Sequence, residues 1–475
     1  MELDQDLKAR QEARDLARAA EAAQRKLARM GQDQLDAIVE AVGKAFSAAA
    51  PMLAQMAVAE TGFGNTQDKT TKNRFASGEV AKAIRDMKTV GILREDPRER
   101  LWEIGVPVGV ICGIVPSTNP TSTVCYKAMI ALKAGNAIVF SPHPKALECT
   151  RKAAQIVGEA AVAAGAPEGA VGCLSIPSMA GCQELMGAAQ VRLILATGGP
   201  AMVKAAYSSG KPAIGVGAGN GPAYIHHSAD VKKAMERIAR SKSFDYGTVC
   251  ASEQSIIVEK GMEEAVRREG RALGFYFMDS READALGKLL FRPDGRLDPK
   301  VVGKNAAVLG EMAGFSVPAG TRVLVAREQE AGPTRPYSME KLCPVLAFYV
   351  MDSEEAVLKK VQEVLSHEGA GHTFAIHAED RDVIRRFALE VPVSRFLVNT
   401  PAALGGIGAT TGLFPALTLG CGAVGGSSSS NNISPLDLIN IRRVAWDNGE
   451  TGAEKPVCSE ELVELLTRKI MERLG

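Results

Sequence analysis

The sequence has little of what three large classes of protein require. Its 475 residues include 56 Lys and Arg against 55 Asp and Glu, and a net charge of +1 gives no basic surface for nucleic acid. No uninterrupted apolar run is long enough to cross a membrane, and the charged N-terminal stretch MELDQDLKARQEARDL is not a secretory signal. We therefore expect a cytoplasmic protein that binds neither nucleic acid nor membrane.

The cysteines and histidines lack the spacing that metal sites need. Nine cysteines are present without a CxxC pair or a neighbouring HxxxH, so neither zinc nor an iron–sulfur cluster is expected. An odd number of cysteines without a secretory signal fits a reducing compartment. The histidines show no spacing that nominates a catalytic base. The sequence therefore predicts a protein without a metal.

What the chain does have is an alternation of two kinds of segment. Residues 1–60 carry Ala and Leu at helical spacing. From Gly109 onward, short β-branched apolar runs such as 136–140 and 191–197 alternate with helical segments, as is typical of parallel βαβ units. The alternation resumes after Cys250. Length and pattern together predict an α/β fold with two α/β domains.

Three glycine-rich segments interrupt this alternation. Gly217, Gly219 and Gly221 have the wrong spacing for a dinucleotide fingerprint, so they are interpreted as a turn with close backbone approach. The turn TGGP at 197–200 is equally consistent with an anion site at a helix N-terminus and with an ordinary βα turn. The stretch 405–432 is either a flexible linker or a loop folded around a site.

Single residues do not identify a reaction. Taken alone, Cys250 is more consistent with an inert buried thiol, and Asn119 with a turn residue before Pro120. The residues by themselves lead to a two-domain α/β enzyme with a nucleotide-sized site, and no further.

Several segments taken together resemble a known family. They are IVPSTNPTS (114–122), FSPHP (140–144), LATGGPAMVKAAYSSGKPAIGVGAGNGP (195–222), SKSFDYGTVCASEQS (241–255), EKLCPVL (340–346), GAGHT (369–373) and FPALTLGCGAVGGSS (414–428). They are similar to the CoA-acylating acetaldehyde and propionaldehyde dehydrogenases of the aldehyde dehydrogenase superfamily. The similarity is strongest to the aldehyde dehydrogenase half of bifunctional aldehyde–alcohol dehydrogenases and covers about residues 10–445.

The resemblance implies a domain plan. A Rossmann-like NAD-binding domain would occupy residues 1–245, with part of an oligomerisation arm near 96–110. A catalytic domain carrying the nucleophilic cysteine would occupy 246–430, and 431–446 would return to the NAD-binding domain and the arm. Residues 447–475 would form a linker and an amphipathic terminal helix.

The resemblance also implies a reaction on Cys250. Its thiolate would add to an aldehyde, and the Asn119 amide with the Cys250 backbone N–H would hold the oxyanion of the thiohemiacetal. Hydride loss to NAD would leave a thioacyl enzyme. Hydrolytic relatives carry a Glu base where this chain has Val216, so the acyl group is expected to pass to CoA and not to water. His372 would assist the thiol step; a packed loop histidine is the alternative.

A set of cofactor-binding residues follows in the same way. The nicotinamide side would be formed by 114–119, the pyrophosphate would lie at Gly199, and Glu340 would hold a ribose. NAD is favoured over NADP, although Ser141 stands where many hydrolytic members carry a Lys. The full predicted set is Ile114, Val115, Pro116, Ser117, Thr118, Asn119, Ser141, His143, Gly199, Gly217, Glu340 and Leu419.

The C-terminal segment carries a separate expectation. Leu462, Leu466, Ile470 and Leu474 lie four residues apart after a polar linker. The helix at 459–474 is similar to peptides that carry enzymes into bacterial microcompartments, where it would bind shell proteins; packing on its own subunit or on a neighbour is the alternative. A homo-oligomer, dimer or tetramer, is expected. A hydrolytic aldehyde dehydrogenase and a non-catalytic scaffold or cargo protein remain the competing functions.

Overall fold

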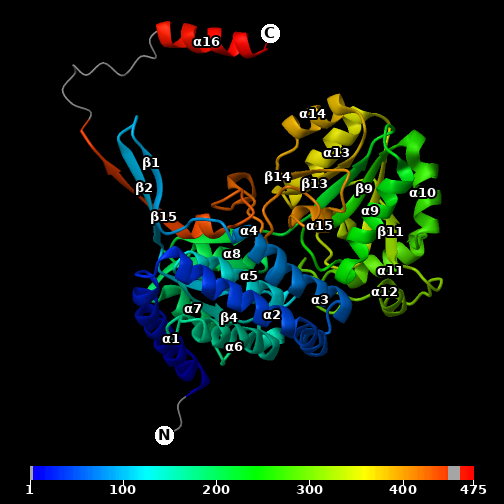
Figure 1. Cartoon of the computed structure of the whole chain (residues 1–475). Coiled ribbons are helices and arrows are strands. Elements are labelled where there is room, and N and C mark those ends of the chain that lie inside the picture. The colour runs from blue at the N-terminus through cyan, green and yellow to red at the C-terminus, as the bar shows by residue number, and fades with distance from the viewer. Residues whose placement is uncertain (1–3, 448–459, 475) are drawn as a thin grey trace.

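The computed structural model describes residues 4–447 and 460–474, and it arranges them around three β-sheets (Figure 1). Two sheets are parallel and are covered by helices, and the third is a small antiparallel sheet that projects from the body. The predicted α/β class is therefore confirmed. The expected domain boundaries stay predictions, and the structure shows only to which sheet each strand belongs.

The first parallel sheet has five strands in the order β5-β4-β3-β6-β7. Their bounds are β3 (Val110–Ile114), β4 (Ala137–Ser141), β5 (Val171–Cys173), β6 (Val191–Thr197) and β7 (Ala213–Val216). The strand order reverses between β3 and β6, so right-handed connections place α5 and α6 on one face and α7 and α8 on the other. The helices are α1 (Gln5–Leu27), α2 (Gln32–Thr61), α3 (Thr66–Arg74), α4 (Val80–Ile84), α5 (Pro120–Lys133), α6 (Leu147–Ala163), α7 (Met179–Gly187) and α8 (Pro200–Tyr207), with a π-helical turn at Phe75–Glu79 and a 3₁₀ turn at Pro144–Ala146.

The second parallel sheet has seven strands in the order β10-β11-β12-β9-β8-β13-β14. Residues alternate along each strand between two cores; on β12, Tyr349 packs in one core and Phe348 in the other. The strands are β8 (Gly221–Ile225), β9 (Glu253–Glu259), β10 (Phe275–Phe277), β11 (Val323–Arg327), β12 (Val345–Met351), β13 (Gly371–His377) and β14 (Val393–Val398). The helices are α9 (Val231–Ser243), α10 (Glu263–Ala272), α11 (Ser280–Leu290), α12 (Ala306–Met312), α13 (Glu354–His367), α14 (Arg381–Glu390) and α15 (Ala402–Gly406), with 3₁₀ turns at Phe244–Gly247, Lys260–Met262, Pro336–Ser338, Ala423–Gly425 and Pro435–Leu438.

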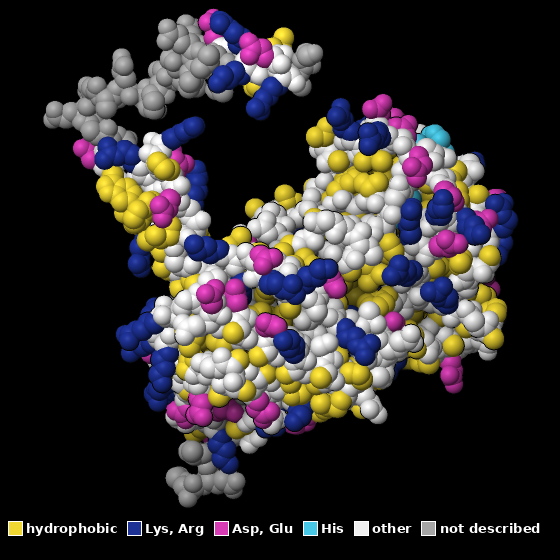
Figure 2. Space-filling view, viewed as in Figure 1, with side chains coloured by type: hydrophobic (Ala, Val, Ile, Leu, Met, Phe, Trp, Pro, Cys, Tyr) yellow, Lys and Arg dark blue, Asp and Glu magenta, His cyan; other side chains and the backbone are white. Residues whose placement is uncertain are grey.

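The third sheet forms an arm of three antiparallel strands in the order β1-β2-β15. Its strands are β1 (Gly91–Asp96), β2 (Leu101–Pro107) and β15 (Ile439–Ala445), so the arm joins the segment near 96–110 to the segment 431–446. Trp102 and Trp446 meet edge to face with ring centroids 4.9 Å apart. Figure 2 shows hydrophobic side chains gathered on this arm, where Trp446 is 40% and Ile441 38% exposed.

The chain enters the second sheet earlier than the sequence suggests. Strand β7 ends at Val216 in the first sheet and β8 begins at Gly221 in the second, so sheet membership changes at 217–220 and not at 245. This crossing needs glycine, since a Cβ on Gly219 would lie 1.9 Å from the Cys250 carbonyl oxygen. The expected close backbone approach at this turn is therefore confirmed.

Helix α2 is the one described helix whose length and mean hydropathy of 1.3 would suit a membrane span. It packs against α3, α5 and α6, and its buried residues, among them Leu35, Phe46 and Leu53, belong to the core of the first domain. Packing inside the domain accounts for its apolar content.

Helix α16 (Glu460–Leu474) follows the predicted linker, most of which lies outside the described residues. Ile470 and Met471 on this helix are 56% and 68% exposed. Figure 1 shows the helix beyond the arm.

Candidate active site

A cavity of about 430 Å³ lies at the carboxyl ends of the first sheet's strands. Strands β3, β4, β6 and β7 end at Ile114, Ser141, Thr197 and Val216, and each of these residues lines the cavity. Ligands of open α/β sheets bind at this edge, where the strand order reverses. All the residues predicted for the site line it, with the exception of His372: Ile114, Val115, Pro116, Ser117, Thr118, Asn119, Ser141, His143, Gly199, Gly217, Cys250, Glu340 and Leu419.

Cys250 reaches this cavity from the second domain, just before strand β9. The turn before it is unusual, because Asp245 and Tyr246 adopt left-handed φ values of 46° and 52°. Such conformations cost of order 1–3 kcal/mol each and persist where the surroundings impose them. Gly247 completes the turn at φ 74°, and a Cβ there would lie 2.7 Å from the Cys343 carbonyl oxygen. Tertiary packing therefore fixes the position of the thiol.

The half-buried thiol of Cys250 is neutral in this environment. Burial raises the pKa of Cys250 to about 12, and the nearby Glu340 and Cys421 add to the rise. The buried guanidinium of Arg395 on β14 acts in the opposite direction. A nucleophilic role thus requires that ligand binding favour the thiolate.

We expect this pKa to be visible in alkylation kinetics. Between about pH 7 and about pH 10, the rate of Cys250 modification by iodoacetamide should rise about tenfold per pH unit without a plateau, because only the thiolate reacts. The measurement is mass spectrometry of the Cys250 peptide, with an unstructured cysteine peptide as the control. A plateau near the ordinary thiol pKa would contradict the expectation.

Asn119 lines the same cavity from the start of α5, with Pro120 as the first residue of the helix. Its side-chain Oδ1 accepts from Lys72 Nζ, and its Nδ2 lies 3.2 Å from Thr118 Oγ1 and 3.3 Å from the Thr248 carbonyl oxygen. Burial lowers the pKa of Lys72 to about 8, while Asp245 raises it. Asn119 is therefore held by a charged group and is more than a turn residue.

The other end of the cavity fits a dinucleotide. Gly199 caps the N-terminus of α8, the positive end of the helix dipole, which suits a pyrophosphate. The half-buried carboxyl of Glu340 accepts from the Gly219 N–H at 2.9 Å, and desolvation together with the neighbouring Glu368 raises the pKa of Glu340 to about 8. Ser141 and His143 lie at the end of β4 and just beyond it. Bound NAD would supply the hydride acceptor here.

Val216 closes strand β7 and is almost fully buried beside the cavity. Among the described residues that line the cavity, Glu340 is the one carboxylic acid, and its Oε1 is engaged by Gly219. The position at which a base is expected in hydrolytic relatives therefore carries the apolar Val216 in this chain.

His372 lies outside the lining of the cavity, and its role in the thiol step stays a prediction. The residue lies on β13, fully buried, with Nδ1 2.8 Å from Thr373 Oγ1. Burial lowers the pKa of His372 to about 3, with Arg395 adding to the effect. Burial agrees with the alternative of a packed histidine, while the buried Nε2 of His372 has no hydrogen-bond partner among the described residues.

The stretch 405–432 is a loop folded around the site. Ile407, Leu417 and Leu419 line the cavity. The Ser427 hydroxyl donates to the Gly215 carbonyl oxygen at 2.6 Å, and the Ser428 N–H donates to Tyr207 Oη at 2.9 Å. The TGGP turn likewise belongs to the site through Gly199.

Four residues near the site were not predicted from the sequence. Arg395 donates to the Gly420 carbonyl oxygen at 2.6 Å and so holds the 405–432 loop. Lys69, Lys72 and Asp245 form a buried charge cluster behind Asn119. Two sequence features could have indicated these residues: an arginine inside an apolar strand, RFLV, and two lysines three residues apart on one helix face, KTTK.

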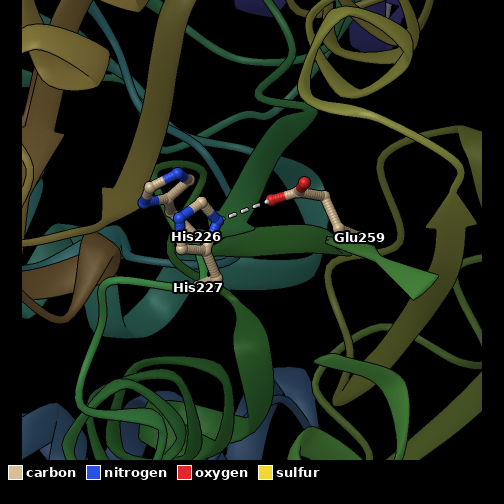
Figure 3. Close-up of side chains that lie close together, drawn as sticks. All are labelled: His226, His227 and Glu259. Atoms are coloured by element: carbon tan, nitrogen blue, oxygen red, sulfur yellow. Dashed lines mark hydrogen bonds and ion pairs between the residues drawn. The ribbon is translucent and has the colours of Figure 1, made fainter. Parts of the chain in front are cut away.

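A second cluster lies at the carboxyl edge of the other sheet (Figure 3). His227 Nδ1 is 3.3 Å from Glu259 Oε1, which also accepts from Tyr224 Oη at 3.0 Å. His226 Nδ1 faces Ser228 Oγ at 2.8 Å. Within residues 4–447 and 460–474 this is the one group whose ligand atoms are close enough to consider for a metal. Glu259 Oε1 and the Nδ1 atoms of both histidines have protein partners, whereas the buried His226 Nε2 has no hydrogen-bond partner in the part of the chain that the structure describes. We assign this cluster no metal.

The chain is similar to proteins of known sequence and structure. The sequence profile of the aldehyde dehydrogenase family matches residues 5–272, more than half of the chain. The bifunctional aldehyde-alcohol dehydrogenase AdhE of Escherichia coli K12 is 45% identical over 428 residues, which are 89% of this chain and 48% of that protein. The chain thus spans about half the length of such curated relatives.

Solved structures match over nearly the whole chain. An acetylating aldehyde dehydrogenase from Geobacillus thermoglucosidasius is 49% identical, with a TM-score of 0.93 over 95% of this chain and 100% of that one. A propionaldehyde dehydrogenase from the fucose utilisation bacterial microcompartment of Clostridium phytofermentans is 28% identical, with a TM-score of 0.83 over 93% and 98%. On this fold and these matches, the chain belongs to the aldehyde dehydrogenase family.

Proposed function

We propose that the protein oxidises a short-chain aldehyde to its acyl-CoA with NAD+ and CoA, reversibly. The observation that carries this is a cavity in which Cys250 and Asn119 stand together while the position of the hydrolytic base is the apolar Val216. The similarity to an acetylating aldehyde dehydrogenase at 49% identity supports the same reaction.

The residues of the chain divide the reaction between them. The Cys250 sulfur bonds to the aldehyde carbon, and the carbonyl electron pair moves to oxygen, where the Asn119 amide donates to it. When the carbonyl reforms, hydride leaves the carbon and a Cys250 thioester remains. CoA thiolate then attacks this thioester and releases acyl-CoA, with the Cys250 thiolate as leaving group. The sum is aldehyde, CoA and NAD+ to acyl-CoA, NADH and a proton.

The direct test is NADH formation from acetaldehyde and from propionaldehyde, with and without CoA, with the product identified by mass spectrometry. CoA-dependent turnover to acyl-CoA supports the proposal. Equal rates with free acid as product would support a hydrolytic dehydrogenase. No turnover with any aldehyde of two to four carbons, or with sulfoacetaldehyde, would support a non-catalytic scaffold or cargo protein.

Substitution Val216→Glu should open a hydrolytic route. A carboxylate at this buried position can take a proton from water, and a general base contributes about 10²- to 10⁴-fold to such a step. We expect CoA-independent formation of free acid to rise at least about tenfold over the parent protein. Val216→Gln is the matched control, because it has similar size and no base. Equal acid formation by the two variants would contradict the assignment of this position.

The assembly of the protein is also part of the proposal. The arm of β1, β2 and β15, with the half-exposed Trp446 and Ile441, is proposed as the contact of a homo-oligomer, dimer or tetramer.

The residues at 459–474 are proposed to bind microcompartment shell proteins, supported by the exposed Ile470 and Met471 and by the similarity to a microcompartment propionaldehyde dehydrogenase. A fluorescent protein fused to 447–475 should co-sediment with shells; diffuse signal with shells present would refute this.

NAD is proposed as the dinucleotide over NADP. The preference rests on the family resemblance, because the neutral Ser141 hydroxyl near the expected adenosine end does not repel a 2′-phosphate. Comparing kcat/KM for the two cofactors tests the preference.

A further inference from the structure

A buried charge cluster supports Asn119 from behind. Lys69 and Lys72 lie three residues apart on α3, and both side chains are nearly fully buried together with Asp245. Lys69 Nζ donates to Asp245 Oδ2 at 2.9 Å and to the Thr118 carbonyl oxygen at 2.8 Å. Lys72 Nζ donates to Asp245 Oδ2, to Asn119 Oδ1 and, at 3.3 Å, to Thr248 Oγ1. The three donors of the Lys72 ammonium therefore all have acceptors.

The contact with Lys72 fixes which way the Asn119 amide faces. An ammonium group can donate hydrogen bonds but cannot accept them, so the amide oxygen must lie on the Lys72 side. The NH₂ group then lies on the side of Thr118 and Thr248, at contacts of 3.2 and 3.3 Å, the weak end of the hydrogen-bond range, and Asn119 lines the cavity. The amide presents the group that an oxyanion needs.

The ammonium has a second effect on the same amide. A positive charge at the amide oxygen draws electron density from nitrogen, which makes the N–H a stronger donor, and hydrogen bonds in series strengthen one another in this way. Preorganised donors of this kind act where negative charge develops on the reacting oxygen.

Asp245 keeps Lys72 charged and in place. Its carboxylate pairs with both lysines, and its Oδ1 accepts from the Asn65 backbone N–H at 2.9 Å. Asp68, the other carboxylate at this cluster, accepts from the Asp245 N–H at 2.7 Å. Two ammonium groups thus face two carboxylates. Gly64 allows the approach, because a Cβ there would lie 1.8 Å from Asp245 Oδ1.

The geometry points to Lys72 as a positioning residue for the oxyanion site, with Asp245 as its counter-ion: Lys72 orients and polarises the Asn119 amide that stabilises the thiohemiacetal oxygen. The inference rests on the proposed function. The cluster comes from three distant parts of the chain, which are α3, the start of α5 and the turn before Cys250.

The test is Lys72→Met, which keeps the length of the side chain and removes its charge while Lys69 still pairs with Asp245. We expect kcat to fall about 10- to 100-fold with KM changed less than about threefold, a loss within that of a whole oxyanion donor. Alkylation of Cys250 by iodoacetamide should stay within about threefold of the parent rate, because that reaction forms no oxyanion. Lys133→Met is the matched control: Lys133 is equally buried and pairs with Asp36, away from the cavity.

A double-mutant cycle with Asn119→Ala separates this role from a structural one. If Lys72 acts through Asn119, adding Lys72→Met to Asn119→Ala should lower kcat less than about threefold further. Additive losses, or a parent-like kcat in soluble Lys72→Met, would overturn the inference. If Lys72→Met does not fold, Lys72→Gln takes its place. Because Gln can still donate to Asn119 Oδ1 and lacks only the charge, kcat should fall less than in Asn119→Ala, and a parent-like kcat would overturn the polarising role. Absence of CoA-dependent turnover in the parent protein would instead refute the proposed function.

Discussion

Cys250→Ala should abolish aldehyde oxidation. The other cysteine lining the cavity, Cys182, lies beside Ser141 at the end of β4. Loss of a covalent nucleophile costs up to about 10⁶-fold in kcat, so we expect a fall of at least about 10⁴-fold. The measurement is NADH formation at saturating aldehyde, CoA and NAD+. NAD+ affinity, followed by the quenching of protein fluorescence, should change less than about threefold because binding does not use the thiol.

Cys125→Ala is the matched control for this variant. Cys125 is a fully buried thiol on α5 outside the lining of the cavity, so the change removes a sulfur without touching the reaction. The control should keep kcat within about threefold while losing some thermal stability. Turnover by Cys250→Ala above about a hundredth of the parent rate would assign the chemistry to another group.

Asn119→Ala should lower kcat about 10²- to 10³-fold, because it removes one donor from the developing oxyanion. KM for the aldehyde should change little, since the ground-state carbonyl needs the donor less than the transition state does. Steady-state kinetics in the acylating direction separate the two parameters. Reduction of acyl-CoA, which passes through the same thiohemiacetal, should be slowed by a similar factor.

Asn136→Ala is the matched control for the amide. Asn136 is fully buried, accepts from the Gly109 N–H at 2.9 Å and donates to the Leu438 carbonyl oxygen at 2.8 Å, away from the cavity. Its loss should reduce the melting temperature with a nearly unchanged kcat. If Asn119→Ala instead raised KM with an unchanged kcat, Asn119 would act in substrate binding and not on the oxyanion.

The fold class could be predicted because local patterns report it. Runs such as 136–140 and 191–197 are apolar throughout, as buried parallel strands are, and they became β4 and β6. The point where the chain crosses between sheets was not predictable in this way. Strand β8 reads like any other short apolar strand, and only its pairing with β9 and β13 assigns it to the second sheet.

For the site, the sequence named its residues through long motifs, and His372 is the one of them that does not line the cavity. A histidine in a motif can face either side of a strand, and pairing decides which. The cluster around Lys72, in contrast, could not be predicted from the sequence. Lys69 and Lys72 look like solvated helix residues, and burial beside Asp245 appears only when α3 packs against a turn about 170 residues later.

By itself, the sequence determined the α/β class, the family and the identity of a cysteine, an amide and an apolar residue in place of a base. These depend on residue type and order along the chain. The tertiary structure decided that Cys250, Asn119, Val216 and Glu340 share one cavity, that His372 lies outside it, and that a buried ammonium supports the amide. The physical reason is that residues far apart in sequence come close only in the folded chain. Burial in that fold is also what shifts the pKa of Cys250 and Lys72.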